Sequence, residues 1–190
     1  MTTQIFNFSE LYCPRKIVFG CGSINSLSNE IKYLNSSKVL IITTKGRGKD
    51  ETIRRIRNLL KKEGIVTDVY DNVVAEPTKS SVLDCLKQIK RKKYDLLIGI
   101  GGGSTLDTTK IVSVLLTNNK PLDKLVGINQ IGNKGVPTIL VPTTAGSGSE
   151  VTHIALFTDE IEKKKKALVS KHLMSDCSII DPQLTLSLPL

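Results

Sequence analysis

Short apolar runs alternate with amphipathic stretches along most of this chain, and that alternation limits the folds open to it. The runs 39–42 and 96–100 contain no charged residue, which is typical of strands buried on both faces of a sheet. Between these runs, Ile53, Ile56 and Leu59 recur at helical spacing. The alternation predicts an α/β fold, in which helices cover both faces of a parallel sheet.

The same patterns predict the individual elements. Strands are expected at 16–19, 38–43, 65–70, 95–100, 136–141 and 177–180, and helices at 23–34, 50–63, 80–92 and 104–117. The segment 73–77 is expected to be a loop. After His153 the pattern changes, because apolar residues at 154–157 and 167–169 flank a charged turn. This change predicts an antiparallel hairpin near the C-terminus.

The chain is basic, which raises the question of a nucleic-acid partner. Its 190 residues include 27 Lys and Arg against 18 Asp and Glu, so the net charge is +9. Much of the excess lies in two runs, 90–93 and 163–166. The first ends a predicted helix, where cations are favoured by the helix dipole, and the second lies in the charged turn. Neither run is interleaved with the aromatic residues that stack on bases, so no nucleic-acid partner is expected.

Other global features point to a cytoplasmic protein. The four cysteines are scattered without a CxxC pair, which argues against a disulfide framework or a structural zinc site. No apolar run approaches the roughly 18 residues of a membrane-spanning helix. The N-terminal residues lack the basic start and apolar stretch of a secretory signal. We therefore expect a cytoplasmic location and no membrane partner.

A glycine-rich loop is the sharpest local motif. Gly101, Gly102 and Gly103 lie between a predicted buried strand and a predicted helix. Glycines allow the backbone to approach a ligand closely, and the free N–H groups of the helix that follows suit a phosphate or pyrophosphate. Ser104 and Asp107 have the spacing of a helix-capping pair. The loop is neither a P-loop nor a GxGxxG motif, and taken alone it could be a turn without a ligand.

A second loop, 142–152, follows the next predicted strand. Thr143, Thr144 and several small residues offer hydroxyl groups and backbone donors there. Ligands of open parallel sheets collect at the carboxyl ends of the strands, where both loops are expected. Either loop alone could be an ordinary turn. Together they favour a dinucleotide over a lone phosphate.

Several segments resemble the iron-containing alcohol dehydrogenase family. They are 14–20, 73–78, 101–110, 142–152 and 181–185, and the resemblance spans nearly the whole chain in the family's order and spacing. It implies a Rossmann-like fold of the kind found in the N-terminal domain of dehydroquinate synthase-like proteins. It also implies that residues 1–190 are the NAD(P)-binding domain of an enzyme that interconverts a small alcohol with an aldehyde or ketone.

Two other interpretations remain open. One is a stand-alone dinucleotide-binding module without turnover. The other is a relative of the wider fold group, such as a glycerol dehydrogenase-like or dehydroquinate synthase-like enzyme. The run 143–150 favours the iron-containing branch over these relatives.

The resemblance implies a set of residues that bind the nicotinamide cofactor. The pyrophosphate would be held by Gly102, Gly103 and Ser104. The adenosine side would be lined by Thr143, Thr144 and Ser147, with Thr152 nearby. Lys166 matches a family lysine that reaches the cofactor ribose, and Leu184 matches a position near the nicotinamide.

One position departs from the family in a way that affects cofactor choice. Many members have an Asp after the second strand, and its carboxylate binds the ribose 2′-hydroxyl and repels a 2′-phosphate. Here the position is Thr44, followed by Lys45 and Arg47. A neutral side chain with two nearby cations should favour NADP over NAD. A basic, solvent-exposed loop is the alternative. Glu76 also stands where the family often has Asn.

The resemblance also implies a divalent metal, iron or zinc, that polarises the alcohol or aldehyde oxygen. Its ligands, one Asp and three His, would lie in a helical domain after the segment 181–185, beyond the end of this chain. His153 and His172 fall outside that pattern, so no metal ligand and no catalytic residue is expected here. The chain is expected to be a fragment that is inactive alone, and a homodimer is expected from the family.

Overall fold

A computed structural model describes residues 10–186 of the chain. Its larger sheet has six parallel strands in the order β1-β9-β6-β4-β2-β3. These strands are β1 (Ile17–Phe19), β2 (Lys38–Thr44), β3 (Val66–Val73), β4 (Leu96–Gly101), β6 (Thr138–Pro142) and β9 (Cys177–Ile180). The sheet confirms the predicted parallel α/β fold.

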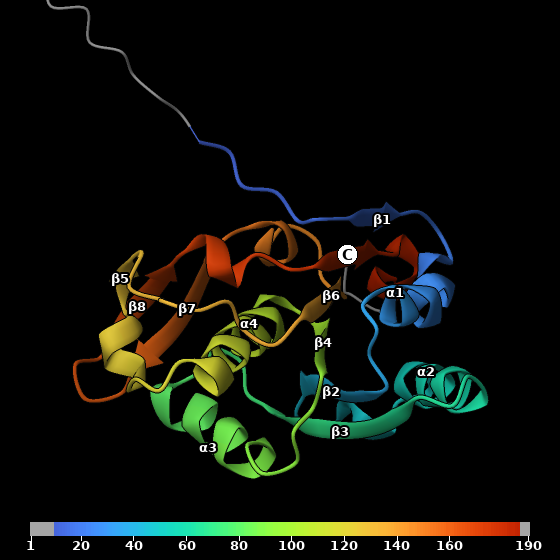
Figure 1. Cartoon of the computed structure of the whole chain (residues 1–190), viewed down its shortest axis with the longest axis horizontal. Coiled ribbons are helices and arrows are strands. Elements are labelled where there is room, and N and C mark those ends of the chain that lie inside the picture. The colour runs from blue at the N-terminus through green and yellow to red at the C-terminus, as the bar shows by residue number, and fades with distance from the viewer. Residues whose placement is uncertain (1–9, 187–190) are drawn as a thin grey trace, which may run out of the picture.

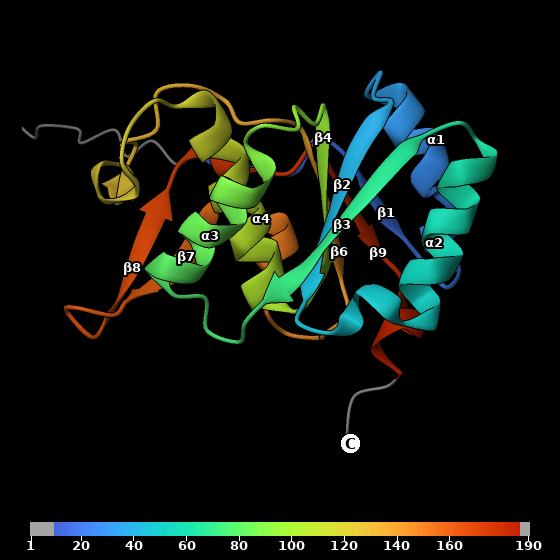
Figure 2. The same ribbon diagram turned by 90° about the horizontal axis from the view of Figure 1, so that it is seen from below.

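Helices cover both faces of this sheet. They are α1 (Leu27–Tyr33), α2 (Glu51–Lys62), α3 (Lys79–Ile89) and α4 (Gly103–Thr117), and Figure 2 shows α1 and α2 on one face and α3 and α4 on the other. The side chains of β2 alternate between two apolar clusters. Val39 and Ile41 pack with the α1–α2 side, while Leu40 and Ile42 pack with the α3–α4 side. This alternation is why the strand carries no polar residue at those positions.

A smaller mixed sheet lies beyond α3 and α4 (Figure 1). It contains β5 (Gly127–Ile128), β7 (Ile154–Asp159) and β8 (Lys164–Val169) in the order β5-β8-β7. Strands β7 and β8 are antiparallel, which confirms the predicted hairpin. Strand β5 joins β8 in parallel and was not predicted, because two residues are too short to show a periodic pattern.

Several element boundaries differ from the predictions, and α3, for example, ends at Ile89 and not at 92. The helix expected at 23–34 begins as a 3₁₀ turn, η1 (Ser23–Ser26), before α1. Its first turn is held by the carboxylate of Asp181, which accepts hydrogen bonds from the N–H groups of Gly22 and Ile24. Strand β3 continues to Val73, into the predicted loop, because an edge strand tolerates polar residues such as Asp71 and Asn72.

Short 3₁₀ turns complete the described chain. Besides η1 they are η2 (Arg47–Lys49), η3 (Leu122–Leu125), η4 (Ser149–Val151), η5 (Lys171–Leu173) and η6 (Pro182–Thr185). None of the helices within residues 10–186 is both long and apolar enough to cross a bilayer. At the C-terminal end, residues 187–190 lie outside the described part.

Candidate functional site

The glycine loop and the threonine- and serine-rich loop meet at the carboxyl edge of the parallel sheet. They follow β4 and β6, which are neighbours in the sheet. The N–H of Thr143 donates a hydrogen bond of 2.9 Å to the carbonyl of Gly101, so the two loops touch directly. At the end of β2, the hydroxyl oxygen of Thr44 lies 3.1 Å from that of Thr105, in the first turn of α4. The adjacent strands β2, β4 and β6 thus bring Thr44 and the two loops to one place.

The glycines of the first loop are required by how closely its neighbours approach. A Cβ atom on Gly102 would lie 3.2 Å from the methyl carbon of Thr144, and one on Gly103 would lie 3.1 Å from Cβ of Ser147. On Gly101 it would come within 2.6 Å of the Thr105 hydroxyl. The two loops therefore pack closely, with glycine backbone on one side and small hydroxyl side chains on the other.

The N-terminus of α4 differs from the prediction. The helix begins at Gly103, with Gly102 as its N-cap, and no side chain caps it. Ser104 and Asp107 do not form the expected capping pair, because both bind other segments. The Ser104 hydroxyl accepts from the N–H of Glu76, and the Asp107 carboxylate accepts from the Ser149 hydroxyl and the Leu156 N–H. The first-turn N–H groups of a 15-residue helix are thereby left without a side-chain cap, which suits an anion.

Glu76 adopts an unusual backbone conformation beside this turn. Its φ angle is 51°, in the left-handed region that favours Gly, Asn and Asp over longer side chains. Its carboxylate lies 3.3 Å from the ammonium of Lys165 on β8. The residue therefore connects the start of α4 with the small sheet.

The basic residues after β2 are only partly free. Arg47 donates through Nε to the carboxylate of Asp50 at 2.5 Å, and both side chains are about two-fifths exposed. Arg47 also lines a small cavity together with Thr143 and Leu184. The cavity has a volume of about 20 Å³, which is room for roughly one water molecule. Leu184 thus lies at the same sheet edge as Thr143.

Lys166 lies farther along the small sheet. Its ammonium is 3.1 Å from the carboxylate of Asp159 and 2.5 Å from that of Glu162. The hydrogen bond that Lys166 donates to Glu162, followed by the one it donates to Asp159, raises the pKa of Lys166. These ion pairs would have to open before Lys166 could reach a ligand.

The structure also places Lys110 and Asp107 beside the second loop, and the sequence analysis did not assign either to the site. Lys110 is fully buried in α4, and its ammonium lies 3.2 Å from the carboxylate of Asp107. Burial lowers the pKa of Lys110, and the charge of Asp107 opposes that shift. The signal in the sequence is a lysine three residues after an aspartate, in a helix that has no other charged residue. Thr152, predicted to lie nearby, directs its carbonyl oxygen toward Lys110 at 3.4 Å.

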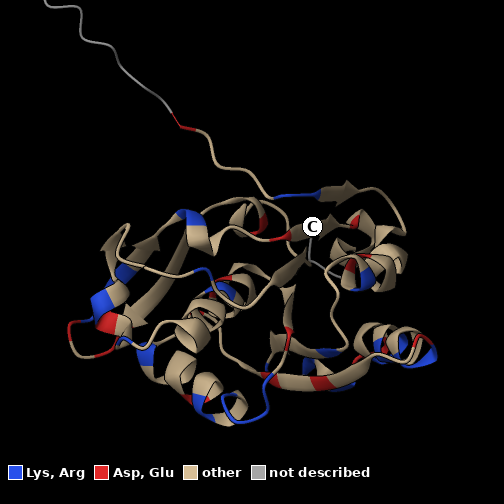
Figure 3. Cartoon of the chain, in the orientation of Figure 1, with Lys and Arg blue, Asp and Glu red and all other residues tan. Residues whose placement is uncertain are grey.

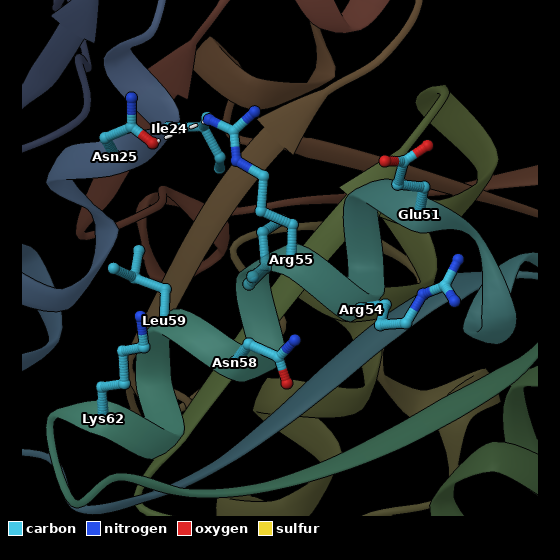
Figure 4. Close-up of a pocket in the computed structure, with 9 residues that line it drawn as sticks. Ile24, Asn25, Glu51, Arg54, Arg55, Asn58, Leu59 and Lys62 are labelled. Atoms are coloured by element: carbon cyan, nitrogen blue, oxygen red, sulfur yellow. Dashed lines mark hydrogen bonds between the residues drawn. The ribbon is translucent and has the colours of Figure 1, made fainter.

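A larger groove lies elsewhere, between η1 and α2 (Figure 4). It has a volume of about 490 Å³ and is lined by apolar, amide and charged side chains, and the guanidinium of Arg55 donates to the side-chain oxygen of Asn25 at 2.8 Å. None of the predicted cofactor-binding residues lines it. Figure 3 shows cations on α2, and also on the hairpin of β7 and β8 and in the turn after α3. Within residues 10–186, no three His, Cys, Asp or Glu residues are grouped so that they could hold a metal ion.

Comparisons with known proteins agree with these loops and this topology. A family model described as iron-containing alcohol dehydrogenase matches residues 14–182. Sulfoacetaldehyde reductase from Bilophila wadsworthia is 42% identical over 178 residues, which are 94% of this chain and 46% of that protein.

Two solved structures have the same fold. NADH-dependent butanol dehydrogenase A from Thermotoga maritima is 34% identical with a TM-score of 0.87, covering 96% of this chain and 46% of that one. Sulfoacetaldehyde reductase from Bifidobacterium kashiwanohense, in complex with NAD⁺, is 25% identical with a TM-score of 0.88, covering 97% and 49%. The chain thus spans about half the length of the relatives it matches. Because the family model covers most of its residues and the motif loops meet as that fold requires, the chain belongs to the iron-containing alcohol dehydrogenase family.

Proposed function

We propose that this chain is the NAD(P)-binding domain of a metal-dependent alcohol dehydrogenase or aldehyde reductase. The protein would transfer a hydride between the nicotinamide and a small alcohol or aldehyde, and the nicotinamide supplies that chemistry when bound. The observation that carries the proposal is the meeting of the two loops beside the uncapped N-terminus of α4. The relatives named as reductases and alcohol dehydrogenases support the reaction class.

The predicted residues fit a dinucleotide in the following way. The backbone N–H groups of Gly103 and Ser104, at the positive end of the α4 dipole, would bind the pyrophosphate. The glycines allow the two loops to approach each other closely, since a Cβ at Gly102 or Gly103 would crowd the second loop. The hydroxyl groups of Thr143, Thr144 and Ser147 would line the adenosine side, with the Thr152 segment behind them. Lys166 and Leu184 would approach the ribose and the nicotinamide.

We propose a preference for NADP over NAD. Thr44 puts a neutral hydroxyl at the end of β2, and Lys45 and Arg47 place two cations within three residues of it. The ion pair of Arg47 with Asp50 weakens its attraction for a 2′-phosphate, so Lys45 carries more of this argument.

The metal would be bound outside the described residues. Iron or zinc is what the family implies, but residues 10–186 contain no set of side chains that fits such an ion. We therefore propose that a second, helical domain of the protein supplies the ligands, that this chain is inactive alone, and that no residue described here acts on the substrate oxygen.

The assembly and location are also proposals. β1 is an edge strand of the larger sheet and exposes Ile17 and Phe19, the latter with 73% of its surface accessible. An exposed apolar edge strand is suited to pairing with another chain, which supports a homodimer. Sedimentation of the full chain would test this, and a monomer at micromolar concentration would contradict it. We propose a cytoplasmic location, because all four cysteines are free thiols, the state that a reducing compartment maintains.

Calorimetric titration with NADPH and NADH, without added metal, tests cofactor binding. Gly103→Ala is expected to lower the affinity about tenfold or more, because its Cβ would press on Ser147 where the phosphate must enter. Gly132→Ala is the matched control, since its Cβ would have its nearest neighbour at 3.8 Å. A folded wild-type chain that binds neither nucleotide would refute the proposal, and so would equal affinities of the two variants.

A further inference from the structure

Lys110 has no role in the proposed cofactor contacts, yet its side chain is completely buried. Its ammonium donates a hydrogen bond of 2.8 Å to the carbonyl of Ser149 and another to the carbonyl of Ile154. The carbonyl of Thr152 lies 3.4 Å from the ammonium. These three carbonyls belong to η4, to the residue that follows it and to the start of β7, at the C-terminal end of the threonine- and serine-rich loop. One side chain of α4 therefore fastens the segment on which that loop ends.

Asp107, one turn earlier in α4, binds the same segment from a second direction. One carboxylate oxygen accepts a hydrogen bond of 2.5 Å from the Ser149 hydroxyl. The other accepts a hydrogen bond of 3.1 Å from the N–H of Leu156 in β7. Asp107 also lies 3.2 Å from the Lys110 ammonium. The two opposite charges thus share Ser149 as a partner, and together they also contact Thr152, Ile154 and Leu156.

Such a pair is better suited to fixing a geometry than to adding stability. Taking two charges out of water is costly, and their attraction repays that cost only when every donor and acceptor is paired. Here the ammonium has three carbonyl partners and a carboxylate, while the carboxylate has a hydroxyl, an N–H and the ammonium. All of these hydrogen bonds form together only when α4 and the η4 segment are held in one relative position.

The backbone of the threonine- and serine-rich loop turns at two glycines between these anchors. Gly146 and Gly148 adopt φ angles of 91° and 64°, which few other residues tolerate. At its start the loop is tied to the glycine loop by the hydrogen bond from Thr143 to Gly101. At its end the loop is held to the helix that follows the glycine loop by the buried Lys110 and its partner Asp107, the two charged residues of α4.

We propose that Lys110 and Asp107 are positioning residues that hold the loop 143–148 at a fixed separation from Gly102 and Gly103. Both walls of the candidate nucleotide site are thereby attached to one rigid helix. The consequence for ligand affinity rests on the proposed dinucleotide function. The attachment itself does not.

Hydrogen exchange of the full, ligand-free chain tests the attachment. Lys110→Met keeps the length of the side chain but removes its charge and donors, and we expect amides in 143–156 to exchange about tenfold faster or more. Amides of β2 should be unchanged. Ser113→Ala, at another buried position of α4, is the matched control and should leave 143–156 as in the wild type. Ser149→Ala removes the hydroxyl partner of Asp107. It replaces Lys110→Met in this test if Lys110→Met does not fold.

Affinity then separates positioning from general stability. Lys110→Met should raise the Kd for NADPH about tenfold, and in a Thr144→Val background the same change should have a much smaller effect, because a contact already lost cannot be misplaced. Strictly additive effects, or a loosened loop with unaltered affinity, would overturn the proposal. Unaltered exchange in both Lys110→Met and Ser149→Ala would overturn it as well. If the wild type binds neither NADPH nor NADH, the proposed function fails, and the exchange data alone decide whether Lys110 and Asp107 fix the loop.

Discussion

Thr44 is the residue on which the proposed cofactor preference depends. Its hydroxyl is shared with Thr105, so the side chain is held at the end of β2. We predict that Thr44→Asp lowers the affinity for NADPH about tenfold or more relative to NADH, because the new carboxylate repels a 2′-phosphate and accepts from a 2′-hydroxyl. Titration of both nucleotides measures the ratio. Thr44→Val, which removes only the hydroxyl, should leave the ratio unchanged, and an equal shift in both variants would contradict the argument.

The four cysteines divide into two classes by exposure. Cys13 and Cys21 are exposed, while Cys85 and Cys177 are buried. Burial raises the pKa of the Cys85 thiol to about 12 and that of Cys177 to about 11. Since the thiolate is the reactive form, we predict two fast-reacting thiols with a disulfide reagent at pH 8 and two that react only after unfolding. Counting released chromophore with and without urea checks this, and four fast thiols would show that the core opens readily.

Asp68 and Tyr94 form a polar contact whose strength depends on pH. The Tyr94 hydroxyl donates 2.5 Å to Asp68, and this bond, assisted by Lys92, lowers the pKa of the carboxyl. A carboxyl group whose pKa is lowered by folding stabilises the folded state when the pH is above its unfolded pKa of about 3.9. This stabilisation is lost as the pH falls through the pKa of the folded state. We predict that Tyr94→Phe lowers the free energy of unfolding by about 1 kcal/mol at pH 7 and by less below pH 4. Urea unfolding at both pH values tests this, and an equal loss at both would show that the carboxylate charge is not involved.

At the scale of the element, α2 carries more positive charge than its neighbours neutralise. Nearby Asp50 and Glu63 are paired with Arg47 and Lys32 instead. Arg57 lies three residues after Arg54 and four before Lys61, so it repels both. We predict that Arg57→Glu raises the free energy of unfolding by about 0.5–1 kcal/mol, and Arg57→Gln by about half as much. Thermal unfolding at low and high salt measures this, and a gain that persists in 1 M salt would rule out charge as its cause.

The elements differ in how well the sequence predicts them. β2, β4, α2 and α4 were predicted to within a residue or two, because long apolar runs and helical periodicity arise from burial against the sheet. β5 and η1 were not, since their conformations depend on partners far away in the chain. β5 pairs with β8, and η1 is held by Asp181. The capping pair at Ser104 and Asp107 was wrong for the same reason: local spacing cannot show that distant segments compete for both side chains.

At the scale of the whole molecule, the candidate site is more predictable from sequence than its support. The glycine and threonine residues are visible as motifs because each loop uses contiguous residues, and adjacent strand ends must share an edge. The partners of Lys110 are backbone carbonyls about forty residues away in the chain, and a carbonyl leaves no trace in side-chain identity. The pairing of Lys166 with Asp159 and Glu162 was missed for another reason, because it depends on the register of the hairpin.

The first and last described parts of the chain are joined in one place. β1 pairs in parallel with β9, and the carboxylate of Asp181, just after β9, accepts from the N–H groups of Gly22, Ile24 and Gln183. Asp181 is 1% exposed, so these donors have little access to water when the carboxylate is removed. We predict that Asp181→Ala lowers the free energy of unfolding by about 2–3 kcal/mol, and Asp181→Asn by less, because the amide oxygen still accepts.

Urea unfolding of the full chain followed by both far-ultraviolet circular dichroism and hydrogen exchange tests this prediction. If Asp181 joins the two ends of the larger sheet, Asp181→Ala should raise exchange in 17–27 and in 177–184 together, and lower the urea midpoint of the whole transition. Asp176→Ala offers a comparison, since Asp176 is also buried near β9 but accepts from Thr138 and Lys134. Faster exchange in 177–184 alone would mean that η6 is capped locally and that β1 is held by its strand pairing without help from Asp181.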